Sequence, residues 1–419
     1  MGKLSGRRQR LLVAVVAFVI SAVATIVATD SPSAVSPSDS ASNGASSAPA
    51  SAGATGGAGG GTAAAQTSNG RQLHIGIAYG DTLTWKSDKD LAIGLDDAVN
   101  SGAKWVRVDL SWKNIQPENS KHYEWQRFDR VVKAARDRKL EVLPTLAYTP
   151  DWARKPGCQG DDASCPPADP ALFAAFAEDA AQRYAPMGVH TWEVWNEPNI
   201  PFWAPKPDPA AYTKLLEVTS KALRAADPKA YVLMGGLAAV GTNPEKAYVS
   251  QTDFLTEVSK LGANRLVDAI SYHPYTYPDL PSARTTYGTA FEQISTAKDN
   301  LVAVLDKYGT PDLPIWLTET GAPTDGPGTA ADGKSNAADT ATHVTEEFQA
   351  AIATDTIPAS AANRHVDAVF WFADQDAGTD KDKAHRSLFY GLRRYDGTPK
   401  PALAAFGAAI AAYEKQPKQ

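Results

Sequence analysis

The stretch HTWEVWNEPN, residues 190–199, decides the fold class. Its first part is rich in β-branched and aromatic residues, as strands are, and Pro198 ends the strand because proline has no N–H for strand pairing. Asn196 and Glu197 stand directly before this stop, so an amide and a carboxylate lie at a strand end. Such groups are either solvent-facing loop residues or part of a site, and the rest of the chain decides between these readings.

Strand patterns of this kind recur along the chain. From residue 71 onward, short β-branched or aromatic runs alternate with segments whose apolar residues are three and four apart, as in helices. Eight strand–helix units over roughly 350 residues predict a (β/α)8 TIM barrel. A doubly wound sheet is the alternative, but no glycine fingerprint follows the first strand. The expected strands cover residues 74–79, 105–112, 140–148, 190–199, 231–238, 268–275, 314–321 and 367–376.

In such a barrel, catalytic groups lie at the carboxyl ends of the strands. Glu197 ends the fourth expected strand, and Glu319 ends the seventh. Two carboxylates facing each other there suit glycosidic hydrolysis, in which one group protonates the leaving oxygen and the other attacks the anomeric carbon. A separation of about 5–5.5 Å between them implies retention through a covalent glycosyl-enzyme.

The neighbours of the two glutamates suggest different roles for them. Arg107 on the second strand and Tyr275 on the sixth favour an ionised Glu319, which we therefore expect to be the nucleophile. Asp109 shares a strand face with Arg107. Glu197, flanked by Trp195 and Pro198, has a more apolar setting that raises a carboxyl pKa, and we expect it to be the acid/base.

Four motifs in combination resemble one large clan of proteins. WNEPN (195–199), YHPY (272–275), WLTETG (316–321) and FWF (370–372) are similar to motifs of retaining glycoside hydrolases whose (β/α)8 barrels carry catalytic glutamates on strands 4 and 7. Families 5 and 39 are the most similar, over residues 71–412. The resemblance implies that Arg107 and Tyr275 support the nucleophile, that Asn196 contacts the sugar 2-hydroxyl, that His273 lies in the catalytic subsite, and that Trp371 forms the floor under the scissile sugar.

The third expected strand departs from this pattern. Many family 5 enzymes have a histidine at its end, whereas TLAYTPDWA (145–153) offers Tyr148 and Trp152. The departure favours family 39, or an unassigned relative, over a plain family 5 cellulase. We expect Trp152 and Trp203 to bind sugar rings in the cleft because both lie just beyond strand ends. The alternative is that these tryptophans only pack loops at the rim.

The amino-terminal part of the chain indicates export. Basic residues precede an uncharged apolar run at 11–28, a pattern typical of an export signal. At 18 residues the run is long for a cleaved signal and just enough to span a bilayer. Residues 1–29 are therefore a cleaved signal peptide or an uncleaved membrane anchor, with the anchor slightly favoured.

The other predicted units follow from composition. Residues 30–70 are almost entirely small or polar and predict a disordered linker. Residues 71–419 then form the catalytic domain, either secreted or tethered outside the cytoplasmic membrane. In an exported protein the close pair Cys158 and Cys165 predicts a disulfide.

Composition also limits the partners. The formal net charge of −6 gives no basic patch for nucleic acid. No metal-binding motif occurs, so neither a metal nor a cofactor is expected, and we expect a monomer. The predicted function is an exported retaining glycosidase that acts on a polysaccharide or oligosaccharide by double displacement. A catalytically silent glycan-binding barrel is one alternative, because a fold alone does not fix function. A transglycosylase that uses the same two glutamates is another.

Overall fold

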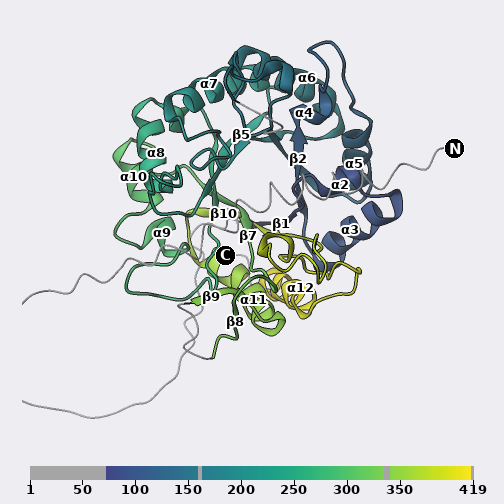
Figure 1. Ribbon diagram of the computed structural model, residues 1–419, viewed down its shortest axis with the longest axis vertical. Helices are drawn as coiled ribbons and strands as arrows, with labels where there is room; N and C mark the ends of the chain where they lie inside the picture. Colours follow the sequence, from purple (N-terminus) through teal and green to yellow (C-terminus); the bar gives the residue numbers. More distant parts are fainter. Residues whose placement is uncertain (1–71, 159–162, 335–339, 417–419) are drawn as a thin grey trace, which may run out of the picture.

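The computed structural model describes residues 72–158, 163–334 and 340–416. These residues form a closed barrel of parallel strands with helices around its outside (Figure 1). Going round the barrel, the order is β1-β10-β7-β6-β5-β4-β3-β2, so β10 closes the sheet against β1. The barrel prediction is therefore confirmed, and the open doubly wound sheet is wrong. The barrel strands are β1 (His74–Ala78), β2 (Trp105–Ser111), β3 (Glu141–Ala147), β4 (Thr191–Asn196), β5 (Tyr231–Ala238), β6 (Ala269–His273), β7 (Ile315–Thr320) and β10 (Val366–Phe372).

The helices start where the sequence provides caps. The Asp169 and Asp208 side chains accept hydrogen bonds from backbone N–H groups of the first turns of α6 and α7, and a proline follows each cap. The longer helices are α3 (Asp88–Ser101), α5 (Gln126–Asp137), α6 (Pro170–Tyr184), α7 (Pro209–Ala226), α8 (Gln251–Lys260), α10 (Leu301–Lys307), α11 (Glu346–Ala362) and α12 (Pro401–Glu414). Single-turn helices are α2 (Thr82–Trp85), α4 (Trp112–Ile115) and α9 (Glu292–Ser295).

Most barrel strands end earlier than the sequence suggests, and β4 and β10 differ the most. β4 ends at Asn196 and β10 at Phe372, because the chain leaves the sheet at the mouth of the barrel and continues as loop. The long segment after β7 contains a small parallel sheet of its own, formed by β8 (Thr329–Ala331) and β9 (Ala341–Val344).

Aromatic rings fill the barrel at the amino ends of the strands. His74, Trp105 and Trp316 pack with ring centroids 5.3–5.5 Å apart. Phe370 stacks on Trp316, and its ring lies where a Cβ atom on Gly76 would come within 2.4 Å of it. Only a glycine fits at this point of β1. With this end filled, polar groups are left to the carboxyl ends of the strands.

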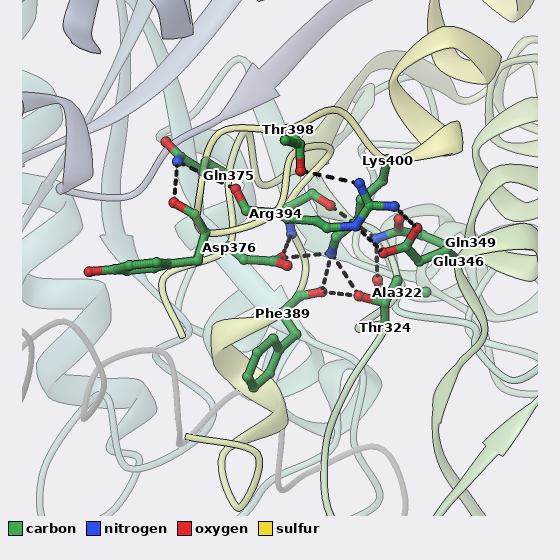
Figure 2. Close-up of polar contacts among 12 residues, drawn as sticks. Ala322, Thr324, Glu346, Gln349, Gln375, Asp376, Phe389, Arg394, Thr398 and Lys400 are labelled. Atoms are coloured by element: carbon green, nitrogen blue, oxygen red, sulfur yellow. Dashed lines mark hydrogen bonds and ion pairs between the residues drawn. The ribbon is translucent and has the colours of Figure 1, made fainter. Parts of the chain in front are cut away.

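A buried ion pair ties together the loops that follow β7 and β10 (Figure 2). Lys400 Nζ donates to Asp376 Oδ1 at 2.7 Å, to the Thr324 hydroxyl at 2.7 Å and to the Phe389 carbonyl at 3.1 Å. Asp376 also accepts from the backbone N–H of Gly391. These bonds fix residues 373–400, the segment between β10 and α12, over the barrel rim.

The predicted amino-terminal units, residues 1–29 and 30–70, lie outside the described residues. Within the described ranges, no helix combines the length and apolar character needed to cross a bilayer.

Candidate active site

An irregular backbone at the end of β4 turns Asn196 and Glu197 toward the barrel mouth. In a regular strand, Glu193, Trp195 and Glu197 would share one face. Glu193 does point into the barrel, but Trp195 packs outward against Phe173 of α6. The backbone is left-handed at Trp195, with φ 74°, and at Glu197, with φ 44°, which interrupts the alternation. Non-glycine residues rarely adopt this conformation, and where they do the strain often marks a functional site.

Glycines of β5 make room for this geometry. A Cβ atom at Gly235 would lie 2.6 Å from the carbonyl oxygen of Trp195, and one at Gly236 would lie 2.1 Å from His273 Nε2. Neither neighbour can move aside easily, because one is a backbone atom and the other belongs to a buried ring. The glycine pair is therefore required for both the turned end of β4 and the position of His273.

Arg107 on β2 lies at the centre of the polar groups. Its Nε donates to Glu193 Oε2 at 2.6 Å, its Nη1 to Glu319 Oε1 at 2.5 Å, and its Nη2 to Asn196 Oδ1 at 2.8 Å. Arg107 is 1% exposed, so these charge-assisted bonds form away from water. One guanidinium thus fixes side chains from β4 and β7 relative to each other. Asn196 Nδ2 has no hydrogen-bond partner in the described part of the chain.

Glu193 is held as an anion beneath the two glutamates. Burial alone would raise its pKa, but the charge of Arg107 and the hydroxyl of Thr145, which donates at 2.8 Å, outweigh that effect and lower it. Thr318 donates a further hydrogen bond to Glu193 Oε1 at 2.9 Å. An ionised carboxylate only accepts hydrogen bonds, so both threonine hydroxyls must give it their hydrogens.

The hydrogen of Thr318 determines the tautomer of His273. Because that hydrogen goes to Glu193, the Thr318 oxygen accepts from His273 Nε2 at 3.0 Å. Burial lowers the pKa of His273, so the ring is neutral and carries its single hydrogen on Nε2. Nδ1 is then an acceptor, and Glu197 Oε1, 2.9 Å away, must supply the hydrogen from a protonated carboxyl group.

The two glutamates have unlike surroundings. Burial raises the pKa of both. Glu319 receives opposing hydrogen bonds from Arg107 and from the Tyr275 hydroxyl, which donates to Oε2 at 2.6 Å, and both favour its ionised form. Glu197 is fully buried, its Oε1 contacts His273, and its Oε2 has no partner among the described residues. A buried carboxyl oxygen without a partner is costly unless it is protonated or meets a ligand.

The glutamates are close enough to act on one bond. One carboxylate oxygen of Glu197, one of Glu319 and one ring nitrogen of His273 all lie within 4.8 Å of one another. In principle these three residues offer ligands to a cation, but Arg107 already brings a fixed positive charge to Glu319. Retaining glycosidic hydrolysis uses a pair of carboxyl groups that lie this close together.

The structure places two predicted sugar-binding tryptophans away from this site. Trp371 is fully buried, and its ring packs against Phe406 of α12, on the outer face of the barrel. Trp203 is 3% exposed and packs between Trp195 and Tyr212. The expectation that these rings line the cleft is therefore wrong, because both fill the space between strands and helices.

Trp152 lies at the rim in a partly exposed position. Its Nε1 donates to the Gln116 carbonyl at 2.8 Å, and its ring meets Trp112 edge-on. Its role in sugar binding stays a prediction. The predicted disulfide between Cys158 and Cys165 is present in the same loop, with the two Cα atoms 6.0 Å apart.

The sequence reasoning missed several residues that shape the site. Glu193 and Thr318 form the chain of hydrogen bonds described above, and the signal for Glu193 was a charged residue in the middle of a buried strand. Phe372, on the strand face opposite Trp371, packs against Tyr390, whose ring in turn lies 5.4 Å from that of Tyr275. Tyr390 comes from the loop held by Lys400, and no local sequence pattern indicates its place.

Taken together, the closed barrel and the paired glutamates define a glycoside hydrolase of the (β/α)8 clan. Residues 63–374 match the model of one family, described as cellulase, glycosyl hydrolase family 5. The match spans most of the chain, which therefore belongs to glycosyl hydrolase family 5. The expectation that the missing strand 3 histidine favours family 39 over family 5 is wrong. It rested on one position, whereas the family 5 model matches residues along the whole barrel.

Other proteins are similar to this chain in sequence or in structure. A beta-xylosidase of Geobacillus stearothermophilus is 31% identical over 157 residues, which is 35% of this chain and 29% of that protein, so less than a third of the relative's length is matched. A family 39 glycoside hydrolase from Bacteroides cellulosilyticus superposes with a TM-score of 0.61 at 21% identity, covering 83% of this chain and 65% of that chain. A GH5_18 protein from Streptomyces cattleya, solved with GlcNAc, gives 0.61 at 20% identity, covering 83% and 82%. At these identities the structural likeness concerns the fold.

Proposed function

We propose that the protein is an exported retaining glycosidase that cleaves β-linked sugars, with Glu319 as nucleophile and Glu197 as acid/base. The observation that carries the proposal is the unlike hydrogen bonding of two buried carboxyl groups within 4.8 Å of each other. Glu319 accepts two strong hydrogen bonds as an anion, whereas Glu197 donates one to His273 as an acid. Pairs of carboxyl groups with opposed surroundings mark the acid and the nucleophile of such enzymes.

The first step forms a covalent intermediate. The ionised Glu319 attacks the anomeric carbon, and the bond from that carbon to the leaving oxygen breaks. Glu197 gives its proton to the leaving oxygen through Oε2, the oxygen that has no partner in the described chain. Asn196 Nδ2 is free to donate to the sugar hydroxyl next to the anomeric carbon, because Arg107 holds only its Oδ1.

The second step releases the sugar. Glu197, now an anion, takes a proton from water, and the resulting oxygen attacks the anomeric carbon while the ester bond to Glu319 breaks. Two inversions at one carbon give net retention. A sugar hydroxyl in place of water would give transglycosylation with the same residues.

The substrate class follows from the relatives and the site together. A beta-xylosidase and a family described as cellulase share sequence with this chain, which supports a β-linked polysaccharide or oligosaccharide. The apolar run at residues 11–28 supports action outside the cytoplasmic membrane, with the chain secreted or anchored there.

The test is to trap the glycosyl-enzyme. The full chain is incubated with 2,4-dinitrophenyl 2-deoxy-2-fluoro-β-glycosides of xylose, glucose and mannose, which form the ester quickly and hydrolyse it slowly. We expect a mass increase of one fluorosugar, located on Glu319 by peptide mapping, and a β-configured first product in proton NMR with the unmodified sugar. A label on another residue, an inverted product or no reaction with the whole panel contradicts the proposal, and the last result favours the silent glycan-binding barrel.

A further inference from the structure

Asp109 lies one pleat closer to the barrel mouth than Arg107. The two residues are two apart on β2 and so point into the barrel on the same face, about 7 Å apart along the strand. Asp109 pairs in register with Thr145 of β3, and its backbone N–H donates to the Gly80 carbonyl just after β1. Its side chain therefore lies on the wall formed by β1, β2 and β3, one pleat beyond Arg107, which itself contacts Glu319.

The Asp109 carboxylate is buried without a partner. The residue is 5% exposed, and no hydrogen bond to its side chain occurs among the described residues. Burial raises its pKa to about 7, because Arg107 offsets only part of the desolvation and the charges of Asp81, Glu319 and Glu193 add to it. A buried acceptor of this kind is satisfied only by water or by a ligand that donates hydrogen bonds.

Tyr148 brings a second polar group to the same wall. It follows the end of β3 with a left-handed backbone, φ 69°, and is 5% exposed. Burial raises the pKa of Tyr148, and the charges of Asp109 and Asp81 add to this effect. Its hydroxyl also has no hydrogen-bond partner within the described ranges.

The charges around this wall indicate what kind of group it accepts. The positive charge of Arg107 is balanced by the carboxylates of Glu193 and Glu319, with which it forms two buried ion pairs. Asp81 lies close enough to raise the pKa of Asp109. The wall is thus rich in acceptors and negative charge, which suits the O–H donors of a neutral sugar and repels an anionic one.

We propose that Asp109 and Tyr148 form a hydroxyl-binding subsite for the neutral sugar held beside Glu319, with Asp109 accepting hydrogen bonds from its hydroxyls. The inference rests on the proposed glycosidase function and adds two specificity-determining residues to it. Neither residue takes part in bond breaking.

The test combines two variants of the full chain with substrate analogues. Asp109→Asn keeps the shape of the side chain, and Tyr148→Phe removes one oxygen. On the best substrate among p-nitrophenyl β-D-xyloside, β-D-glucoside and β-D-mannoside, we expect kcat/KM to fall at least tenfold for Asp109→Asn and less for Tyr148→Phe. Monodeoxy analogues of that substrate then identify the hydroxyl. The analogue that lacks this hydroxyl should be a poor substrate for the unchanged protein. Asp109→Asn should cleave that analogue at the same rate as the unchanged protein or faster.

The matched control is Asp151→Asn, an aspartate in the rim loop after β3 whose side chain is 66% exposed. Its kcat/KM should equal that of the unchanged protein. The inference is overturned if Asp109→Asn loses nothing, if it loses equally on every deoxy analogue, or if p-nitrophenyl β-D-glucuronide is cleaved faster than the glucoside. The trapping experiment on Glu319 distinguishes failure of the subsite from failure of the proposed function. If Glu319 is labelled but Asp109→Asn has unchanged kcat/KM, only the subsite is refuted. If the protein is not labelled at all, the glycosidase function is refuted.

Discussion

Arg107 and Lys400 are both buried cations paired with carboxylates, yet their surroundings differ. Burial opposes the charge of Arg107, but Glu193 and Glu319 outweigh it and raise its pKa. For Lys400 burial prevails, and its pKa is lowered while that of Asp376 is raised to about 6. The Arg107 cluster therefore keeps a permanent charge, whereas the Lys400 pair lies nearer to its neutral form.

The two clusters also differ in how completely they are satisfied. Lys400 uses three acceptors from the loops that follow β7 and β10, as Figure 2 shows, and it has no role at the reacting bond. Beside Arg107, Glu197 Oε2 is buried without a partner in the described chain, and Arg107 bonds only to the Oδ1 atom of Asn196. Polar groups whose hydrogen bonds are all made within the protein stabilise its structure. Polar groups that lack a partner in the protein are available to bind a substrate. We therefore expect substitutions in the Arg107 cluster to affect activity and those in the Lys400 cluster to affect stability.

The largest effect on activity is expected for Glu319→Gln. The amide keeps the shape and can still contact Arg107 and Tyr275, but it cannot attack the anomeric carbon. We expect kcat on aryl β-glycosides to fall by about 10⁴-fold or more, as for other lost nucleophiles. The melting temperature should stay within a few degrees, since Glu193 still pairs with Arg107. A loss of activity that only follows a loss of folded protein would contradict this separation.

Glu197→Ala should affect only one kind of substrate. A poor leaving group needs the proton, so its cleavage should slow by about 10²–10⁴-fold, the usual contribution of general acid catalysis. With dinitrophenyl leaving groups the glycosyl-enzyme still forms without an acid, and a burst of released phenol should precede slow turnover. Stopped-flow absorbance measures the burst. Equal losses on both substrate types would remove Glu197 from the acid role.

Lys400→Met should show the opposite behaviour. Removing one partner leaves Asp376 buried and unpaired, which costs about 3–5 kcal/mol of unfolding free energy. Urea unfolding measures the loss, and the folded fraction should keep its kcat. Lys133→Met is the control, because that lysine pairs with Asp137 on the surface of α5 and should change stability by less than about 0.5 kcal/mol. A Lys400→Met protein with full stability would show that the pair does not hold the loops.

The same contrast explains what the sequence could predict. The barrel follows from a pattern repeated along the chain, and Glu197 and Glu319 follow from their places at strand ends, so both could be read locally. The direction of Trp371 could not, because Phe370, Trp371 and Phe372 are all aromatic, so the local pattern does not show which of these rings point into the barrel. Lys400 bonds to groups up to 76 residues away, and no local pattern marks such a contact.

Thr318→Val is expected to have the smallest effect, and it tests most directly how the residues around Arg107 set the protonation of Glu197. Without the threonine oxygen, His273 Nε2 loses its acceptor, so the hydrogen moves to Nδ1 and is donated to Glu197. That bond favours the ionised carboxylate and lowers the pKa of Glu197. The alkaline limb of kcat/KM against pH, which reports loss of the Glu197 proton, should then move to lower pH by about one unit.

The control is Thr356→Val, at an equally buried threonine of α11, which should leave the alkaline limb in place. A limb that stays fixed or moves to higher pH in Thr318→Val would show that the tautomer of His273 does not set the protonation of the acid.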